Sequence, residues 1–165
     1  MSWKEHLKAD PLPWLLEEGE PGARYLAMRD LLDLSENDSS LITARHVAHQ
    51  RGPIATILAE MHPDGYWIEP GPGYNPKYRS LVWSLILLAS MGARVEEDGR
   101  IQKAMEYCLD HCLAPGGQFA SATAPGGTVD CLQGNLCWAL HALEYEDPRL
   151  EAAFEWMARS LTGEG

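Results

Sequence analysis

The sequence predicts an all-α protein in which helices come in pairs, one buried and one amphipathic. Three observations predict it. Residues 77–91 are apolar on nearly every face, and a helix without a polar face is surrounded by protein. Residues 98–113 instead carry one apolar stripe, as a helix with a single buried side does. The same two patterns then recur at residues 128–145 and 148–161.

The first 20 residues are predicted to form a capping arm. Pro11, Pro13 and Gly19 interrupt this stretch and exclude a long helix. We expect its apolar side chains to pack on the first repeat, and these are Trp3, Leu7, Trp14, Leu15 and Leu16. Pro21 is a favourable first helical residue, so a helix is expected from Pro21 onward.

Asp38 or Ser39 is predicted to be the N-cap of the next helix, which runs to Gln50. His46 and His49 lie three residues apart on it, beside Arg45 and Gln50, and we expect these polar residues to form a solvated face. Gly52-Pro53 ends this helix, and a further helical stretch follows it.

Residues 64–77 are rich in proline and glycine and are predicted to form a loop. Asn75 is expected to cap the following helix, with Pro76 in its first turn, so that the buried helix covers residues 77–91. The last amphipathic helix is expected to start at Pro148, after Asp147 as its N-cap.

The two patterns repeat with a defined register. Gly65 corresponds to Gly117, 52 residues later, and Met91 to Leu143 with the same spacing. After a shorter link the spacing becomes 49, so Asp98 corresponds to Asp147. We therefore predict one helical-repeat domain over residues 21–165, with repeat units at about 21–67, 68–119 and 120–165.

Composition excludes several classes of partner. The net charge of −11, without a basic cluster, disfavours nucleic acid and anionic membranes. No apolar run approaches the roughly 20 residues of a membrane span. The N-terminus lacks the pattern of a secretory signal, so we expect a cytoplasmic location. The four cysteines are then expected to be free thiols or metal ligands.

The repeat unit resembles that of the terpenoid cyclase and protein prenyltransferase superfamily. It consists of a glycine turn with an aromatic residue (Gly116, Gly117 and Phe119), a loop, an inner helix, a short link and Asp147-Pro148-Arg149 before an outer helix. The resemblance implies an α/α toroid-like array of about three inner and outer helix pairs, which is about half of a full toroid. It also implies an apolar cavity lined by inner helices 77–91 and 128–143.

The resemblance implies two chemistries. The squalene-cyclase type protonates an isoprenoid with an Asp-x-Asp-Asp motif, which this sequence lacks. The prenyltransferase type holds zinc with an aspartate, a cysteine two residues later and a distant histidine. Here Asp130 and Cys131 are adjacent and His141 lies on the same helix, so a zinc site on these three residues remains one hypothesis.

Three residues are candidates for catalysis. Asp130, Cys137 and His141 fall at i, i+7 and i+11 and share a helix stripe, and Cys137 and His141 are close enough in sequence to pair. The alternative is that the cysteines are buried apolar residues and His141 is a core histidine; burial would also raise the pKa of a thiol. Whether the chain is an enzyme is left open.

The candidate ligand-binding residues are aromatic or polar and lie at helix starts or on inner helices: Trp67, Tyr78, Arg79, Trp83, Asn135 and Trp138. Trp67, Tyr78 and Arg79 lie around the start of the helix at 77–91, together with Tyr66 and Tyr74. This group either holds an anionic head group such as a diphosphate or orders the loop by packing.

Two functions follow as hypotheses. The first is binding of an apolar, isoprenoid-like ligand, and the second is a non-catalytic interaction module, or a fragment of a longer protein, whose open face is covered by a second copy or a partner.

Overall fold

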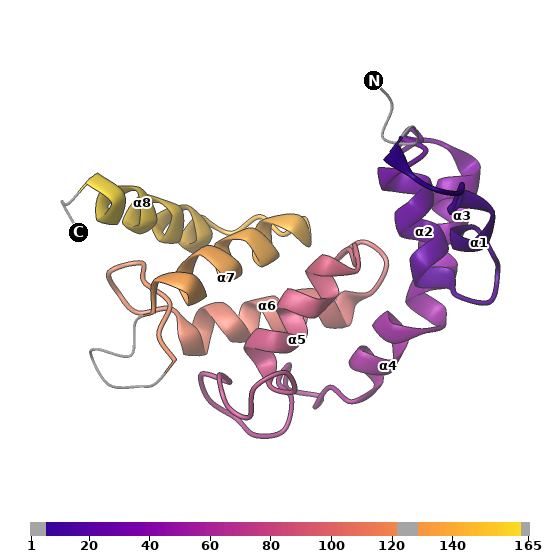
Figure 1. Cartoon of the computed structure of the whole chain (residues 1–165). Helices are drawn as coiled ribbons and strands as arrows, with labels where there is room; N and C mark the ends of the chain where they lie inside the picture. The colour runs from indigo at the N-terminus through magenta and orange to yellow at the C-terminus, as the bar shows by residue number, and fades with distance from the viewer. Residues whose placement is uncertain (1–5, 122–128, 163–165) are drawn as a thin grey trace. The chain divides into compact units, whose positions relative to one another are not determined.

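A computed structural model describes residues 6–121 and 129–162, and these residues form an all-α protein. In chain order the helices are α1 (Leu12–Leu15), α2 (Pro21–Asp30), α3 (Ser39–Gln50), α4 (Pro53–Ala59), α5 (Leu81–Ser90), α6 (Gly99–Cys112), α7 (Asp130–Ala142) and α8 (Pro148–Thr162). Outside these helices, Leu113 and Phe119 form an isolated antiparallel bridge. The predicted fold class is confirmed (Figure 1).

The chain divides into two compact units, Met1–Thr56 and Ile57–Gly165, and α4 contains the boundary between them. In the first unit α2 packs on α3, and α1 contacts α2. In the second, α5 packs on both α6 and α7, and α7 packs on α8. The single domain predicted over residues 21–165 stays a prediction.

The capping arm differs from expectation in its side chains. Leu12 is the buried residue of α1, whereas Trp14 is 71% exposed and Leu7 is also exposed. The reason is the length of α1, whose four residues leave Trp14 on the outer side, while Leu15 and Leu16 are half-buried. Trp3 lies outside the described residues.

The predicted helix starts are confirmed where an aspartate is the cap. The Asp38 carboxylate accepts from the backbone N–H of Ser40 at 2.8 Å, and Asp98 accepts from that of Arg100 at 2.9 Å. Asp147 accepts from that of Arg149 at 2.8 Å before α8. These side chains satisfy N–H groups that have no partner within the helix.

The predicted start of α5 was wrong by four residues. Its N-cap is Ser80 rather than Asn75, because Tyr78 has a left-handed backbone with φ of 67°. The Gly73 carbonyl accepts from Val82 N at 3.1 Å and thereby satisfies one of the first N–H groups of the helix.

The sequence register recurs in three dimensions within the second unit. Gly65 and Gly117 both have positive φ, 101° and 91°. An added Cβ would lie 2.8 Å from Lys103 O at Gly65 and 2.4 Å from Ala152 O at Gly117. Lys103 and Ala152 are 49 residues apart, which is the predicted spacing of the outer helices. Each glycine thus lets its turn approach the outer helix that follows it in the chain.

A second feature repeats with the same spacing. The Arg100 and Arg149 guanidinium groups each chelate the aspartate two residues earlier, with Nη2–Oδ2 distances of 2.7 Å in both repeats. Each guanidinium also reaches the preceding helical segment, where Arg100 Nη1 donates to Leu58 O and Arg149 Nη1 donates to the Asp110 carboxylate. These aspartate–arginine pairs fasten successive outer helices together.

Candidate functional site

The candidate ligand-binding surface begins with an aromatic cluster at the start of α5, formed by Tyr74, Tyr78 and Trp83. The Trp83 ring lies 5.7 Å from that of Tyr74 and 4.9 Å from that of Tyr78, between centroids. Trp83 Nε1 donates to Tyr74 O at 2.9 Å, so the cluster orders its loop as the packing interpretation predicts. Tyr78 is 70% exposed and remains accessible.

Two cationic side chains accompany this cluster. Lys77 Nζ lies 5.7 Å from the centroid of the Tyr74 ring, and Arg79 is exposed just before the N-terminus of α5. Both are close in sequence to Tyr78. This end of α5 therefore combines an exposed aromatic ring with positive charge in a chain whose net charge is −11.

The surface continues onto α7. With the spacing of 52, Trp83 corresponds to Asn135 and Ile86 corresponds to Trp138. The two helices pack directly on each other, and these residues hold equivalent positions of the repeat on them. We call these four residues the α5–α7 face. Trp83 and Ile86 are half-buried, Asn135 is exposed and Trp138 is 47% exposed.

Trp67, another predicted ligand-binding residue, lies inside the protein. Its side chain is buried, and its indole Nε1 donates to Ile57 O at 2.8 Å. Both polar and apolar parts of the ring are thereby used in packing. The structure therefore separates Trp67 from the exposed residues Tyr78, Arg79 and Trp138.

The catalytic candidates do not share one environment. Asp130 and His141 are exposed near opposite ends of α7, and Cys137 is buried. The Gln133 amide lies 3.7 Å from Cys137 Sγ, and the His141 ring meets the edge of Phe154 with centroids 6.3 Å apart. His141 thus packs towards α8, while Cys137 faces the interior.

The zinc hypothesis is not supported by the arrangement of its residues. Eleven residues of helix separate Asp130 from His141, about 16 Å along the axis, which is too far for one ion. Within residues 6–121 and 129–162, no three His, Cys, Asp or Glu side chains gather so as to hold a metal ion.

The four cysteines differ sharply in accessibility. Cys131 is exposed, whereas Cys108, Cys112 and Cys137 are buried. Burial raises the pKa of Cys137 to about 11. A hydrogen bond between the Cys108 thiol and Cys112, together with burial, raises the pKa of Cys108. Both effects favour the unreactive thiol over the thiolate, as the sequence predicted for buried cysteines.

We expect a thiol reagent such as Ellman's reagent to modify Cys131 rapidly in the folded protein at pH 8, because it alone among these thiols is exposed. The other three should react only after unfolding. The Cys131→Ser variant should lose the rapid phase, and Cys137→Ser should retain it. A rapid phase that survives in Cys131→Ser would contradict this assignment.

The raised pKa of Cys137 also predicts a pH dependence. The thiol titrates near 9.0 in the unfolded chain and near 11 in the folded one, so its stabilising contribution is full below pH 9. That contribution is lost as the pH rises towards 11. Urea unfolding at pH 8 and pH 10.5 should show a smaller loss of stability in Cys137→Ala than in the unsubstituted protein.

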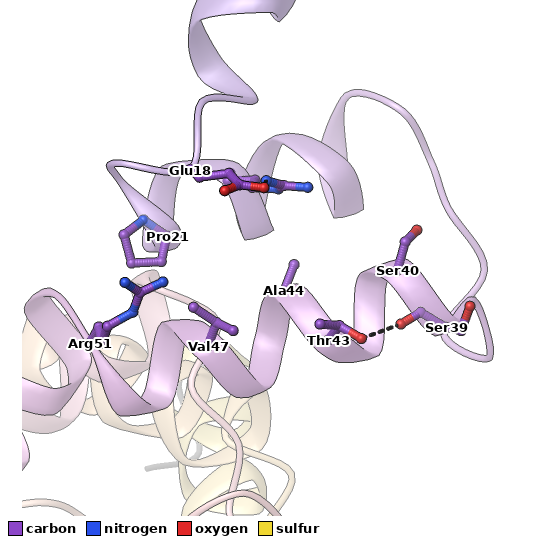
Figure 2. Close-up of a pocket in the computed structure, with 9 residues that line it drawn as sticks. Glu18, Pro21, Ser39, Ser40, Thr43, Ala44, Val47 and Arg51 are labelled. Atoms are coloured by element: carbon purple, nitrogen blue, oxygen red, sulfur yellow. Dashed lines mark hydrogen bonds and ion pairs between the residues drawn. The ribbon is translucent and has the colours of Figure 1, made fainter.

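The first unit contains an open pocket that the sequence did not indicate (Figure 2). Its volume is about 500 Å³, and its lining has an apolar part with Pro21, Ala44 and Val47. Arg51 lies at one end and the hydroxyl residues Ser39, Ser40 and Thr43 lie at the other (Figure 2). The Arg24–Glu18 ion pair, at 3.1 Å, completes the lining. Its residues come from α2, α3, the segment before α2 and the first residue after α3, which explains why no single motif predicted it.

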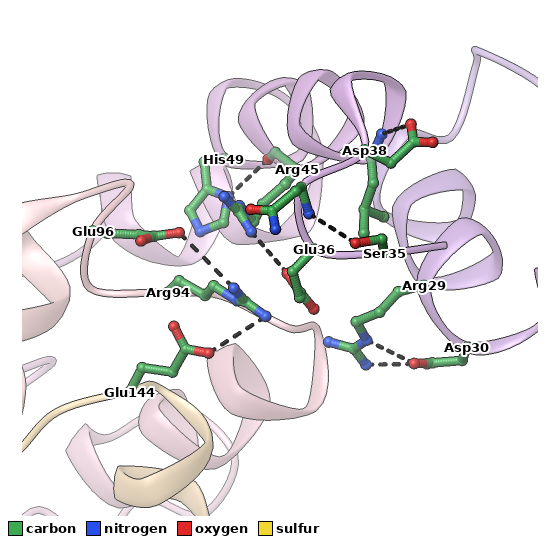
Figure 3. Close-up of polar contacts among 12 residues, drawn as sticks. Arg29, Asp30, Ser35, Glu36, Asp38, Arg45, His49, Arg94, Glu96 and Glu144 are labelled. Carbon is green, nitrogen blue, oxygen red and sulfur yellow. Dashed lines mark hydrogen bonds and ion pairs between the residues drawn. The ribbon is translucent and has the colours of Figure 1, made fainter. Parts of the chain in front are cut away.

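The predicted solvated face of α3 was wrong for two residues. Arg45 and His49 are buried: Arg45 Nη1 lies 3.2 Å from Glu36 Oε2, and His49 Nδ1 lies 2.8 Å from Arg45 O (Figure 3). The reason is the ion pair with Glu36, nine residues earlier, which allows a guanidinium to be buried. His46 and Gln50 are exposed, as expected.

The link after α5 joins the two repeats of the second unit. Arg94 Nη2 lies 3.4 Å from Glu144 Oε1, and Arg94 Nη1 lies 3.9 Å from Glu96 Oε1 (Figure 3). Val95 N donates to Leu143 O at 3.2 Å. These contacts hold the end of α7 against the α5–α6 link and so fix the orientation of the α5–α7 face.

Comparison with known proteins adds no relative: no family model, curated protein or solved structure matches this chain. In the described part of the chain, no helix has both the length and the apolar character needed to cross a membrane.

Proposed function

We propose that this chain is an α/α helical repeat protein, resembling the terpenoid cyclases and protein prenyltransferases, that binds an apolar, isoprenoid-like ligand on the α5–α7 face. The observation that carries the proposal is Trp138, a large aromatic side chain of α7 that is 47% exposed. An exposed indole beside half-buried Trp83 and Ile86 is typical of a surface that contacts another molecule.

The repeat geometry supports this proposal. The glycine turns and the aspartate–arginine pairs recur with the sequence register, and α5 packs on α7. Repeat proteins use the side formed by successive equivalent helices for binding. Fold alone does not give function, so the side chains on this face carry the assignment.

The chemistry of the face indicates the class of ligand. Trp83, Ile86 and Trp138 offer an apolar surface, and Asn135 adds one polar group for orientation. At the start of α5, Lys77 and Arg79 provide charge for an anionic head group beside Tyr78. A polyprenyl chain with a polar or anionic end matches both the apolar surface and the cationic residues beside it. The proposal concerns binding, and no catalytic step is assigned.

Truncation of Trp138 provides the test. We expect Trp138→Ala to weaken the binding of farnesol roughly 10- to 100-fold, since burying a large apolar side chain contributes about 1.5–3 kcal/mol. Trp14→Ala is the matched control, because Trp14 is even more exposed but lies in the first unit. Titration calorimetry would measure both affinities, and circular dichroism would confirm folding.

The head-group contribution can be separated from the apolar one. Arg79→Ala should weaken the binding of farnesyl diphosphate and leave the binding of farnesol unchanged, because only farnesyl diphosphate carries negative charge. Equal farnesol affinity in the Trp138→Ala and unsubstituted proteins would contradict the proposal, as would the absence of farnesol binding to the unsubstituted protein.

A further inference from the structure

The pocket of the first unit contains one cation that no protein group neutralises. Arg24 is paired with Glu18, at 3.1 Å. Arg51, by contrast, is exposed, and no group in the part of the chain that the structure describes pairs with its guanidinium. The two arginines and one glutamate of the lining leave a net charge of +1, in a chain whose net charge is −11. The Arg51 guanidinium is therefore available to an anion that carries a single charge.

An apolar floor leads away from Arg51. Ala44 and Val47 lie between Arg51 and Thr43 on α3, and Pro21 lies across from them at the start of α2 (Figure 2). Ala44 and Pro21 are buried, and Val47 is half-buried. Because these side chains are small, they leave the volume of about 500 Å³ open, which is within the usual range of small-molecule sites. An apolar part of a ligand would gain by covering this floor.

The far end of the pocket offers hydrogen-bond acceptors. The Ser40 hydroxyl donates to the Asp38 carboxylate, and Thr43 Oγ1 donates to Ser39 O at 2.8 Å. A hydroxyl has one proton and two lone pairs, so the oxygens of Ser40 and Thr43 remain free to accept. The Asp38 carboxylate beside Ser40 also repels a second negative charge. This end therefore favours a ligand group that donates a hydrogen bond.

The distance between the two ends requires a long ligand. Eleven residues separate Ser40 from Arg51, which corresponds to about 16 Å along the axis of α3. A compact anion such as acetate or phosphate cannot contact both ends. An extended chain with one charged end and one hydroxyl end can do so.

We infer that this pocket binds an elongated aliphatic monocarboxylate with a hydroxyl group at its far end, an ω-hydroxy carboxylate. The Arg51 guanidinium holds the carboxylate, for which its fork of N–H donors is well suited. The aliphatic chain lies over Pro21, Ala44 and Val47, and the terminal hydroxyl donates to Ser40 or Thr43. This site lies in the first unit and is independent of the α5–α7 face.

Titration calorimetry of the full chain with 10-hydroxydecanoate tests the inference, and 1,10-decanediol is the uncharged ligand of matching length. The unsubstituted protein should bind the carboxylate roughly 10-fold more tightly than the diol, because only the carboxylate pairs with Arg51. In Arg51→Gln this preference should disappear, while the affinity for the diol stays the same. The comparison of two ligands separates the loss of the charge from any general disturbance of the fold.

Two further variants locate the anion. Glu18→Gln should strengthen the binding of 10-hydroxydecanoate about 2- to 5-fold, because it releases Arg24 from its ion pair and removes a negative charge from the lining. Arg79→Gln is the matched control, since Arg79 is also an exposed arginine but lies in the second unit, and it should leave this affinity unchanged.

The hydroxyl end is tested with sebacate, which replaces the hydroxyl group by a second carboxylate and should bind more weakly than 10-hydroxydecanoate. Equal affinity for the two ligands would overturn the assignment of this end. Absence of 10-hydroxydecanoate binding, or a preference over the diol that survives in Arg51→Gln, would overturn the inference. Loss of binding in Arg79→Gln would overturn it as well, because the anion would then lie beside the α5–α7 face.

Discussion

Gly117→Ala should lower the free energy of unfolding by about 2–5 kcal/mol. The substitution forces a residue with a Cβ to keep a left-handed backbone, at φ of 91°, which costs roughly 1–2 kcal/mol. It also brings that Cβ to 2.4 Å from Ala152 O and 2.9 Å from Ala152 C. Both contacts are with backbone atoms of α8, so relief requires the turn to move away from the helix, at a further cost of about 1–3 kcal/mol.

Gly134→Ala is the matched control for this prediction. An added Cβ at Gly134 meets nothing within 4 Å, and the residue lies inside α7. Alanine is the better helix former there by about 1 kcal/mol, so this variant should be as stable as the unsubstituted protein or more stable. Urea denaturation followed by far-ultraviolet circular dichroism would measure both. Equal midpoints for the two variants would refute the proposed role of the glycine turn.

Gln133→Met should destabilise the protein by at least about 3 kcal/mol. Gln133 is buried in α7; its Oε1 accepts from Phe119 N at 2.7 Å, and its Nε2 donates to Ala153 O at 2.9 Å and to Gly117 O at 3.2 Å. Methionine preserves the length of the side chain but leaves these buried backbone groups without their partner, at about 1–3 kcal/mol for each.

Gln102→Met provides the comparison for Gln133→Met. Gln102 is exposed on α6, and its amide donates to Glu106 Oε1 at 2.9 Å on the surface, where water replaces the lost contact. We expect a change within about 0.5 kcal/mol. If the two variants unfold at the same urea concentration, the glycine turn is not held by Gln133.

Local features of the sequence predicted much of the fold. The amphipathic stripe of α6 and the caps at Asp38 and Asp147 depend on residues within one or two turns, so sequence spacing is sufficient to identify them. The repeat register likewise follows from composition and spacing, and the positive φ of Gly65 and Gly117 agrees with it.

The features that the sequence did not predict depend on distant partners. Burial of Arg45 requires Glu36, and Gln133 contacts residues up to 20 positions away. The late start of α5 depends on the left-handed backbone of Tyr78. Tyrosine has no preference for this backbone conformation, so the residue type does not predict it. For the candidate site, the prediction of Trp83 and Trp138 as ligand-binding residues stays a prediction, and only packing shows that Trp67 is buried while Tyr78 is exposed.

The central claim is that the α5–α7 face binds an apolar ligand, and native mass spectrometry tests it most directly. The full chain, incubated with farnesol, should gain the mass of one farnesol molecule per chain, and Trp138→Ala should lose most of that species while Trp14→Ala keeps it. A chain that remains free of ligand, or that retains the same bound fraction after Trp138→Ala, would contradict the claim.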